Sequence, residues 1–365
     1  GTMHWLEGKG LGFGPKVHTI VGGLYQRGHA AQGGGFGYVN ALSRFIKAYP
    51  DKVKVFTDTQ AVSLIKDEQG RVIGVEGKND GKTVKFFASK GVIIATGGFG
   101  SNVDFRQAKN TGVWKEVKLD KDIPCTNNFK ASQGDGLKLA EQVGANIIDL
   151  DDIQLHPGGT PKTGIMSSWP SGRNRIFLTP QGDRFVNEDA ARDTLCKAIF
   201  KEGGKYWIVS NHVKYPSLDY QSKNLTIGEM IKLGQAFSGN TVEELASKTG
   251  MDPKKLKAAI QSYNDAVTGK VKEDSFGFKK STKDDQPMTE GPYYATPMVP
   301  AVHHTMGGIQ INTNAQVLDK NGKVIPGLFA AGEVTGGVHG SNRVGGNGIA
   351  DAMVYGRISG QSALK

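Results

Sequence analysis

Side chains able to bind an anion gather in one glycine-rich stretch near the C-terminus. His303 and His304 precede a Gly-Gly pair, Glu333 follows the apolar run 328–331, and Arg343 lies among glycines shortly after it. A planar guanidinium can donate two parallel hydrogen bonds to a carboxylate, and a histidine can add a further donor. These residue types predict a site that binds a carboxylate and stabilises negative charge on it.

The segments around these side chains predict a nucleotide-type ligand site. Residues 328–331 are short and apolar, as in a buried parallel strand, and end at Gly332-Glu333, where a carboxylate can accept hydrogen bonds from ribose hydroxyls. The glycines that follow let backbone N–H groups approach a ligand closely, and a helix beginning near Gly348 would direct its positive end at it. We interpret the stretch as a flavin site; the competing interpretation is a glycine-rich surface loop.

The same residues carry a family resemblance. Residues 300–308, Pro-Ala-Val-His-His-Thr-Met-Gly-Gly, and residues 331–347 are similar to the C-terminal half of soluble flavin-dependent fumarate reductases, a family that includes reductases of urocanate, acrylate-type and cinnamate-type acids. The resemblance extends over nearly the whole chain. It implies an α/β fold, α+β in part, in which a two-dinucleotide-binding-type flavoprotein domain carries an inserted α+β clamp domain, with FAD as the cofactor.

The first flavin-binding segment of that family has no counterpart in this sequence. A strand followed by G-x-G-x-x-G normally holds the FAD pyrophosphate, but the glycines at 10–14 and 33–37 have a different spacing and strand context. We therefore expect a chain truncated at its N-terminus, which binds FAD weakly until the upstream segment is added. The resemblance also implies an electron donor, with FMN or haem on a missing upstream domain or on another reductase domain or protein.

The predicted domain organisation places residues 1–150 in the first part of an FAD-binding domain, residues 151–304 in the clamp domain and residues 305–365 in the second part of the FAD-binding domain. In the first part we expect a loop-rich region over residues 1–37, a helix over 38–49, a meander of strands at 53–56, 61–65, 72–75 and 84–87, and a buried parallel strand within 91–98. In the clamp domain, helix starts are expected at the Thr241-x-x-Glu244 capping box and at Asp252-Pro253. The charged stretch 270–286 is expected to be solvated.

Four residues are predicted to carry the chemistry. The resemblance places His304, the second of the His pair, and Arg343 on the substrate carboxylate, His156 at the distal end of the substrate, and Arg192 as the proton donor. Taken alone, Arg192 is a helix-surface charge, and Arg184 is the first residue to test if Arg192 is not the acid. The glutamate of the family's proton relay has no counterpart in residues 166–175.

The expected cofactor contacts come from the glycine-rich turns and their neighbours. They are Gly97, Gly98, Gly307, Gly332, Glu333, Gly346, Asn347 and Ile349.

Two further residues bear on the substrate. Ser168 and Trp169 match the threonine and glutamate that the family's fumarate enzymes place on the second carboxylate. An indole offers one N–H and a large apolar face, which suits a flat aromatic substituent better than a charged one. We expect fumarate as the family's default substrate, with urocanate or a cinnamate-type aromatic enoate as the alternative.

Composition excludes several other classes. The net charge is +10 and the pI is about 9.3, but the lysines are scattered among carboxylates. No nucleic-acid partner is therefore predicted. The positive charge is better explained by attraction of an anionic substrate. Cys125 and Cys196 are too few and too isolated for a disulfide framework or a metal site. No apolar run reaches the roughly 18 residues of a transmembrane helix, and the compartment stays open between the cytoplasm and the cell envelope.

The sequence thus predicts an FAD-dependent oxidoreductase that acts on a CH–CH group by reducing an unsaturated carboxylate. A non-catalytic flavin-binding module is the alternative of another class. A ketosteroid-type dehydrogenase is a second enzymatic alternative, against which the carboxylate-binding His304 and Arg343 argue.

Overall fold

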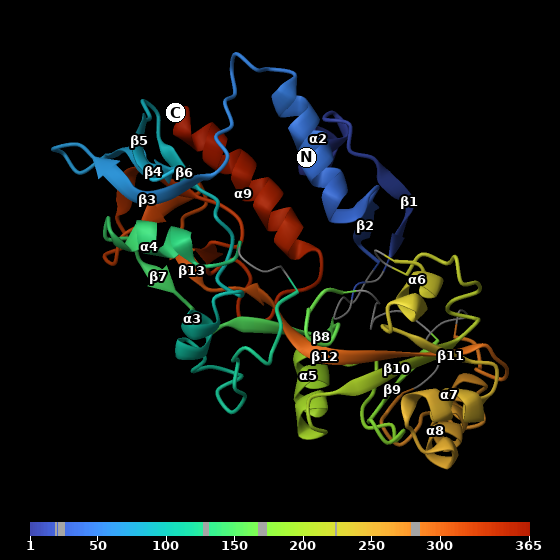
Figure 1. Cartoon of the computed structure of the whole chain (residues 1–365). Helices are drawn as coiled ribbons and strands as arrows, with labels where there is room; N and C mark the ends of the chain where they lie inside the picture. Colours follow the sequence, from blue (N-terminus) through green and yellow to red (C-terminus); the bar gives the residue numbers. More distant parts are fainter. Residues whose placement is uncertain (19, 21–25, 127–130, 167–173, 223–224, 279–284) are drawn as a thin grey trace. The chain divides into compact units, whose positions relative to one another are not determined.

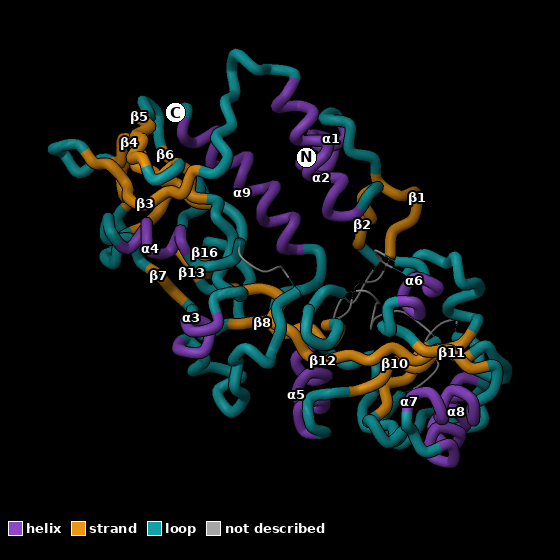
Figure 2. Tube along the Cα trace, viewed as in Figure 1, coloured by secondary structure: helices purple, strands orange, loops and turns teal. Residues whose placement is uncertain are grey.

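The computed structural model describes residues 1–18, 20, 26–126, 131–166, 174–222, 225–278 and 285–365 (Figures 1 and 2). The chain divides into two compact units. Unit 1 comprises Gly1–Phe99, Gln133–Asp152 and Thr305–Lys365, and unit 2 comprises Gly100–Ser132 and Ile153–His304. The assignment of residues 1–150 and 305–365 to an FAD-binding domain, and of 151–304 to a clamp domain, stays a prediction; the compact units differ from it in grouping residues 100–132 with unit 2.

Unit 1 mixes helices and strands (Figure 2), and its strands form both parallel and antiparallel pairs. Its helices are α1 (Thr2–Glu7), α2 (Gly34–Lys47), α4 (Asp135–Glu141) and α9 (Asn347–Ala363). Its strands are β1 (Phe13–His18), β2 (Gly28–Ala31), β3 (Thr59–Lys66), β4 (Val72–Asn79), β5 (Lys82–Phe87), β6 (Val92–Ile94), β7 (Ile147–Ile148), β13 (Gly308–Gln310), β14 (Gln316–Leu318), β15 (Val324–Ala330) and β16 (Thr335–Gly336). The mixture confirms the predicted α/β class.

Within the described part of the chain, unit 2 is built around a five-stranded sheet in which most neighbouring strands are antiparallel, with helices packed on both faces. Its strands are β8 (Ile153–Gly159), β9 (Arg175–Leu178), β10 (Tyr206–Asn211), β11 (Phe237–Gly239) and β12 (Tyr293–Thr305), the last ending one residue inside unit 1. Its helices are α3 (Val103–Ala108), α5 (Arg192–Lys201), α6 (Ile227–Lys232), α7 (Val242–Thr249) and α8 (Pro253–Val267).

The parallel pair β6 and β15 forms the part of unit 1 that matters for the site. The two strands pair with Leu328 opposite Val92 and Ala330 opposite Ile94, so both end at the same edge of the sheet. The predicted parallel strands at 328–331 and within 91–98 are therefore confirmed, although Ile93 is 41% exposed. Helix α9 packs against both strands, and its start at Asn347 confirms the helix expected near Gly348 (Figure 1).

The predicted meander is confirmed for its last three strands, whereas the prediction of its first strand, at residues 53–56, is wrong. Strands β3, β4 and β5 pair in sequence order. Residues 53–56 form no strand; the Phe56 ring packs on the Phe86 ring, with 4.8 Å between the ring centroids. Alternation of apolar and polar residues predicts a half-buried strand, but it cannot show whether an edge is available to pair with it.

The N-terminal region is more regular than expected. Residues 1–37 hold α1, the antiparallel pair β1 and β2, and the first turn of α2, where a loop-rich region was predicted. Helix α2 begins at Gly34, ahead of the predicted start at residue 38, and Gly33 caps it with a φ of 75°. Glycines have low intrinsic helix propensity, so the first turn carries no helix signal in the sequence.

Strand β9 shows why the core of unit 2 is stable. Successive side chains of a strand point to opposite faces. Ile176 and Leu178 join the cluster formed with α7 and α8, while Phe177 joins the cluster that includes Leu195 and Ile199 of α5. The strand is thus buried on both faces, and α5 is held directly on the sheet.

The helix caps of unit 2 follow the sequence signals with one difference. Asp252 caps α8 by accepting hydrogen bonds from the N–H groups of Lys254 and Lys255, as predicted from Asp252-Pro253. Thr241 caps α7, but the Glu244 carboxylate accepts from the N–H of Asn240 and not from that of Thr241, so only half of the predicted capping box forms.

The expectation that residues 270–286 are solvated is confirmed for most of the described part of that stretch, because residues 270–273, 275–277 and 286 are exposed, but it is wrong for three residues. Phe278 is 2% exposed and stacks near Tyr263 in the core, and the Asp274 side chain is buried in an ion pair with Arg184. Asp285 is 1% exposed. A charged loop can be buried when a partner of opposite charge lies elsewhere in the chain, which local composition does not reveal.

Within the described residues, no helix combines the length and the hydropathy that crossing a membrane requires.

Candidate functional site

The glycine loops after β6 and β15 lie at one edge of the parallel pair in unit 1. Gly97 has a φ of 75°, and a Cβ built there would meet no atom within 4 Å. Gly332, directly after β15, has a φ of 77°. Both backbones therefore adopt a conformation that favours glycine, and the backbone at Gly97 is open to close approach by a ligand.

Thr305 joins these two loops. The Glu333 Oε1 atom accepts hydrogen bonds from the Thr305 N–H at 3.0 Å and from its hydroxyl at 3.4 Å, and the Phe99 N–H donates to that hydroxyl at 3.3 Å. A Cβ at Gly98 would lie 2.2 Å from Thr305 Oγ1 and 2.5 Å from Glu333 Oε1. One oxygen of Glu333 thus has a structural role, and its predicted contact with a ribose stays a prediction.

The start of α9 supplies the second element of the edge. Gly346 caps this 17-residue helix with a φ of 80°, and no side chain caps its first N–H groups. No acidic residue lies in the first turn, and Asn347 and Ile349 are exposed there. Such a helix end carries a partial positive charge that favours an anionic ligand group.

Gly307 has a packing reason of its own. A Cβ at this position would lie 1.9 Å from the backbone oxygen of Asp149. The close approach of two backbone segments requires glycine here, so its predicted contact with the cofactor has no separate support in the geometry.

Arg343 is buried in unit 1, where the charges of two carboxylates act on it. It is 6% exposed, and its Nη1 donates to the backbone oxygen of Val344 at 3.1 Å. Burial lowers the pKa of its guanidinium, and the charges of Glu333 and Asp351 partly offset that effect. An arginine keeps its charge in such a setting, so the site holds a permanent cation.

Asp351 and His339 were not predicted as site residues. The His339 Nε2 atom lies 3.4 Å from Asp351 Oδ2, and both side chains are less than a tenth exposed. This pair of side chains connects α9 with the glycine-rich loop that contains Arg343. An acidic residue on the buried face of a helix is the sequence signal that could have identified it.

Unit 2 brings three other polar residues together. His156, on β8, is 4% exposed, and its ring centroid lies 4.9 Å from that of His303 on β12. His156 Nδ1 accepts a hydrogen bond from the Gly158 N–H at 3.0 Å, which places the proton of the neutral ring on Nε2. The Thr126 hydroxyl lies 2.5 Å from His303 Nδ1. His303 and Thr126 were not predicted to take part.

Arg192 is the first residue of α5 and is 9% exposed, so it is not the surface charge that its sequence context alone suggests. Its Nη1 donates to Gln154 Oε1 on β8 at 3.2 Å. Burial raises the pKa of the Cys196 thiol, and the positive charge of Arg192 opposes this effect only in part. His304 is 5% exposed near the end of β12.

Arg184 is a poor substitute for Arg192 as an acid. Burial alone would lower the pKa of Arg184, but the Glu188 and Asp274 carboxylates outweigh it, so the pKa lies above its ordinary value. An arginine held by two carboxylates gives up its proton less readily than one held by neutral groups. Ser168 and Trp169 lie outside the described residues.

Both cysteines carry free thiols: Cys196 is buried, as expected for a packed thiol, and Cys125 is partly exposed. Among the described residues, no group of three or more His, Cys, Asp and Glu side chains is arranged to hold a metal ion.

Comparison with known proteins gives the class to which this geometry belongs. A family model described as an FAD binding domain matches residues 2–349, so the chain belongs to this family of flavoproteins. The predicted resemblance to flavoproteins of the fumarate reductase type is confirmed by the relatives. NADH:acrylate oxidoreductase from Vibrio harveyi is 38% identical over 99% of this chain, which covers 35% of that protein. Urocanate reductase from Eggerthella lenta is 34% identical over 100% of this chain, which covers 59% of that protein.

A solved structure agrees with this assignment. The open conformation of a flavocytochrome c3 fumarate reductase superposes with a TM-score of 0.76 at 32% identity, over 99% of this chain and 61% of that one. The chain thus spans between 35% and 61% of the lengths of these three proteins.

FAD is the cofactor of this family, and the described residues of unit 1 fit it. The open backbone at Gly97, the positive φ of Gly332 and the uncapped first turn of α9 offer N–H groups without obstructing side chains. Asn347 and Ile349 lie in that turn. These residues are suited to hold a dinucleotide, and the individual contacts stay predictions.

Replacing Gly98 tests this arrangement. We expect Gly98→Ala to lower both FAD occupancy and the thermal midpoint, because its Cβ would overlap the Thr305 hydroxyl and the Glu333 carboxylate. Overpacking of this kind costs about 1–3 kcal/mol. Gly356→Ala is the matched control: it lies in α9 with open space around its Cβ, and it should leave FAD binding unchanged. The flavin-to-protein absorbance ratio measures occupancy, and an occupancy and a midpoint equal to those of the unchanged chain in Gly98→Ala would contradict the prediction.

Proposed function

We propose that this chain reduces the carbon–carbon double bond of an α,β-unsaturated carboxylate with FAD as its hydride carrier, and that fumarate is the default substrate. The observation that carries the proposal is Arg343, a buried cation three residues before the cap of α9. A cation at that place can bind a substrate carboxylate close to the start of α9, the helix end that is suited to hold the cofactor. The names of the relatives, which include reductases of acrylate, urocanate and fumarate, support the same class of substrate.

Arg343 and His304 stabilise the charge that develops during reduction. When bound and reduced, FAD would supply the hydride for the carbon β to the carboxylate, so the residues of the site would have to stabilise negative charge on the α-carbon and the carboxylate oxygens. Arg343 donates to those oxygens as a planar fork, and His304 adds a second donor. Each side chain is buried within its own unit, Arg343 in unit 1 and His304 in unit 2.

Arg192 delivers the proton that completes the reaction. The hydride and the proton together add two hydrogens and two electrons across the double bond. Arg192 sits at the positive end of α5, where a positive charge is disfavoured, and the Gln154 amide oxygen fixes the direction of its Nη1–H. A guanidinium seldom gives up its proton, so an arginine that acts as a proton donor needs surroundings that disfavour its charge and orient its N–H. The helix end and the Gln154 oxygen provide these two features and thereby support Arg192 as the proton donor.

The distal end of the substrate is assigned to His156. Its Nε2–H can donate to a carboxylate, and the neighbouring His303 ring adds an aromatic face. The Nε2–H donor of His156 suits the second carboxylate of fumarate. The His303 ring supports an aromatic enoate such as urocanate or a cinnamate as the alternative, in line with the indole expected from Trp169.

The electrons that reduce the flavin come, in this proposal, from a separate domain or protein that carries haem or FMN. Comparing reduced viologen with NADH as the reductant tests this point. Turnover with viologen alone would support a separate donor, and NADH turnover by the isolated chain would contradict it.

Relative kcat/KM values define the substrate. We expect anaerobic reoxidation of the reduced FAD-loaded protein by enoates, with fumarate, urocanate, cinnamate and acrylate compared on one preparation. A preference of 100-fold for one acid corresponds to roughly 2.7 kcal/mol of differential transition-state binding. A fumarate preference of that size would remove the aromatic alternative. If none of the acids reoxidises the flavin, the chain is a non-catalytic flavin-binding module.

A further inference from the structure

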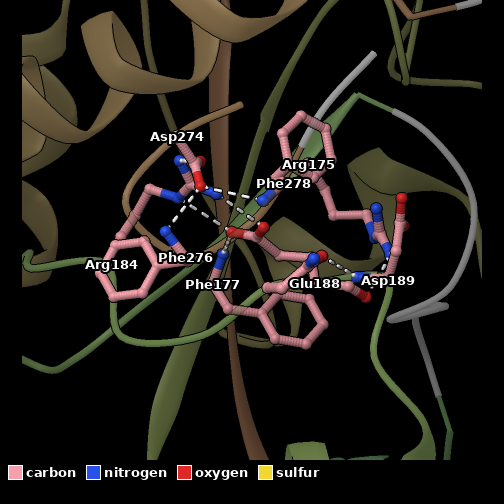
Figure 3. A network of polar contacts seen from close by, with 9 residues as sticks. Arg175, Phe177, Arg184, Glu188, Asp189, Asp274, Phe276 and Phe278 are labelled. Carbon is pink, nitrogen blue, oxygen red and sulfur yellow. Dashed lines mark hydrogen bonds and ion pairs between the residues drawn. The ribbon is translucent and has the colours of Figure 1, made fainter. Parts of the chain in front are cut away.

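A buried cluster of charges lies in unit 2 next to the segment that leads to Arg192. Arg184 donates from Nε and Nη2 to the two oxygens of Glu188, at 3.1 and 2.8 Å, and from Nη1 to Asp274 Oδ2 (Figure 3). The three side chains are 2%, 0% and 2% exposed in that order. Arg184 and Asp274 are 90 residues apart in sequence, so the cluster fixes two distant segments to each other.

Glu188 is also tied to strand β9. Its Oε1 accepts a hydrogen bond from the Phe177 N–H at 3.0 Å, and its backbone oxygen accepts from Arg175 Nη2 at 2.7 Å (Figure 3). Arg175 Nη2 also lies 3.1 Å from Asp189 Oδ1. Side chain and backbone of Glu188 are therefore both held on a strand that is buried on its two faces.

Asp274 is fixed from the opposite side. Its Oδ1 accepts hydrogen bonds from the N–H groups of Phe276 and Phe278, at 2.8 and 3.0 Å. The rings of these two phenylalanines lie 5.5 and 5.6 Å from the Arg184 guanidinium (Figure 3). Each charged group of the cluster thus has several partners, the condition under which a buried ion cluster holds one geometry.

Helix α5 depends on this segment for its start. Its cap residue Ala191 is extended and makes no side-chain cap hydrogen bond. Only three residues separate Glu188 from Arg192, and the turn between them is closed by a hydrogen bond from the Ala190 N–H to the Asn187 oxygen at 3.1 Å. The segment that Glu188 holds on β9 therefore leads directly into the start of α5.

We propose that Glu188, held by Arg184 and Asp274, is a positioning residue that keeps the Arg192 guanidinium in the geometry required for proton transfer. This inference rests on the proposed role of Arg192 as the proton donor. Misplacing a reacting group by about 1 Å can cost 100-fold in rate, so a small shift at the start of α5 has a large effect. A buried ion cluster contributes little net stability compared with apolar packing, and a role in specifying geometry accounts for its presence.

The test uses variants that are expected to fold. Arg184 faces two carboxylates, so Glu188→Gln or Asp274→Asn still leaves it with one carboxylate partner. We expect either variant of the FAD-loaded protein to lower kcat for its best enoate about 10-fold or more, with KM changed by less than about 3-fold. Asp183→Asn is the matched control, because it breaks an exposed pair with Lys255 on the same segment and should change neither value.

A double-mutant cycle distinguishes positioning from a general structural role. If Glu188 acts only through Arg192, Glu188→Gln should have no further effect on kcat in an Arg192→Lys background. An equal loss in both backgrounds, or a kcat within twofold of wild type for Glu188→Gln and Asp274→Asn, would overturn the proposal.

A readout without turnover keeps this inference separate from the proposed function. In spectra of protein labelled with ¹⁵N-arginine, the Arg192 side-chain signal should shift or broaden in Glu188→Gln and Asp274→Asn but not in Asp183→Asn. An unchanged Arg192 signal refutes the positioning role even if no enoate is reduced. A changed signal in a protein that reduces no enoate supports the positioning and removes the proposed function instead.

Discussion

Arg192→Ala should lower kcat by about 100-fold or more and leave KM for the substrate nearly unchanged, as expected when a general acid is lost. The Arg192 side chain is buried at the start of α5 and held by Gln154, so its removal leaves the proton without its assigned donor. Steady-state kinetics with reduced viologen and the preferred enoate measure the effect. Added guanidinium should restore part of the lost rate by entering the vacated space.

Lys197→Ala is the control for this experiment. It removes a positive charge from an exposed position on the same helix, so kcat should stay close to the wild-type value. If Arg192→Ala keeps near wild-type turnover, the proton comes from another group. Arg184 is then not the next residue to test, because its carboxylate partners raise its pKa.

Arg343→Ala should raise KM and lower kcat together. A carboxylate contact present in both the bound substrate and the transition state contributes to both parameters. Loss of a charge-assisted, bidentate donor near developing charge typically costs about 2.7–4 kcal/mol, which corresponds to a 100- to 1,000-fold loss in kcat/KM. Arg343→Lys should recover only part of this loss, because an ammonium keeps the charge but not the planar fork.

Arg357→Ala provides the comparison on the same C-terminal segment. Arg357 lies in α9 and donates to the Thr2 hydroxyl at 3.1 Å, so its loss should not alter KM for an enoate. The flavin spectrum of each variant must be recorded, since Arg343 lies close to Glu333 and Asp351 and its removal leaves those carboxylates with less compensation. A normal flavin content with unchanged KM for all enoates would show that Arg343 does not bind the substrate.

The sequence predicted the elements whose signals are local. Continuous apolar runs that end in glycines identified the parallel strands β6 and β15, and Asp252-Pro253 identified the start of α8. The start of α2 was missed because its first residues are glycines. Residues 53–56 carry a local strand pattern, but pairing depends on a neighbour that the pattern does not contain.

Partners distant in sequence account for what was missed in the candidate site. Asp274 lies in a charged stretch that resembles a solvated loop, and its burial depends on Arg184. The contact between His156 and His303 depends in the same way on β8 and β12, which are far apart in the chain. Motifs predict single residues of the site, whereas the contacts that orient these residues are visible only in the folded chain.

The glycines that follow β6 and β15, and the glycine that caps α9, link the binding of cofactor to the stability of the folded protein. Gly97, Gly332 and Gly346 all adopt positive φ values, and glycine loses more backbone entropy on folding than any other residue. A ligand that binds only the folded form offsets such a loss: free FAD at a thousand times its Kd adds about 4.1 kcal/mol to the free energy of unfolding. We therefore expect the folded fraction of this chain to rise with the concentration of free FAD.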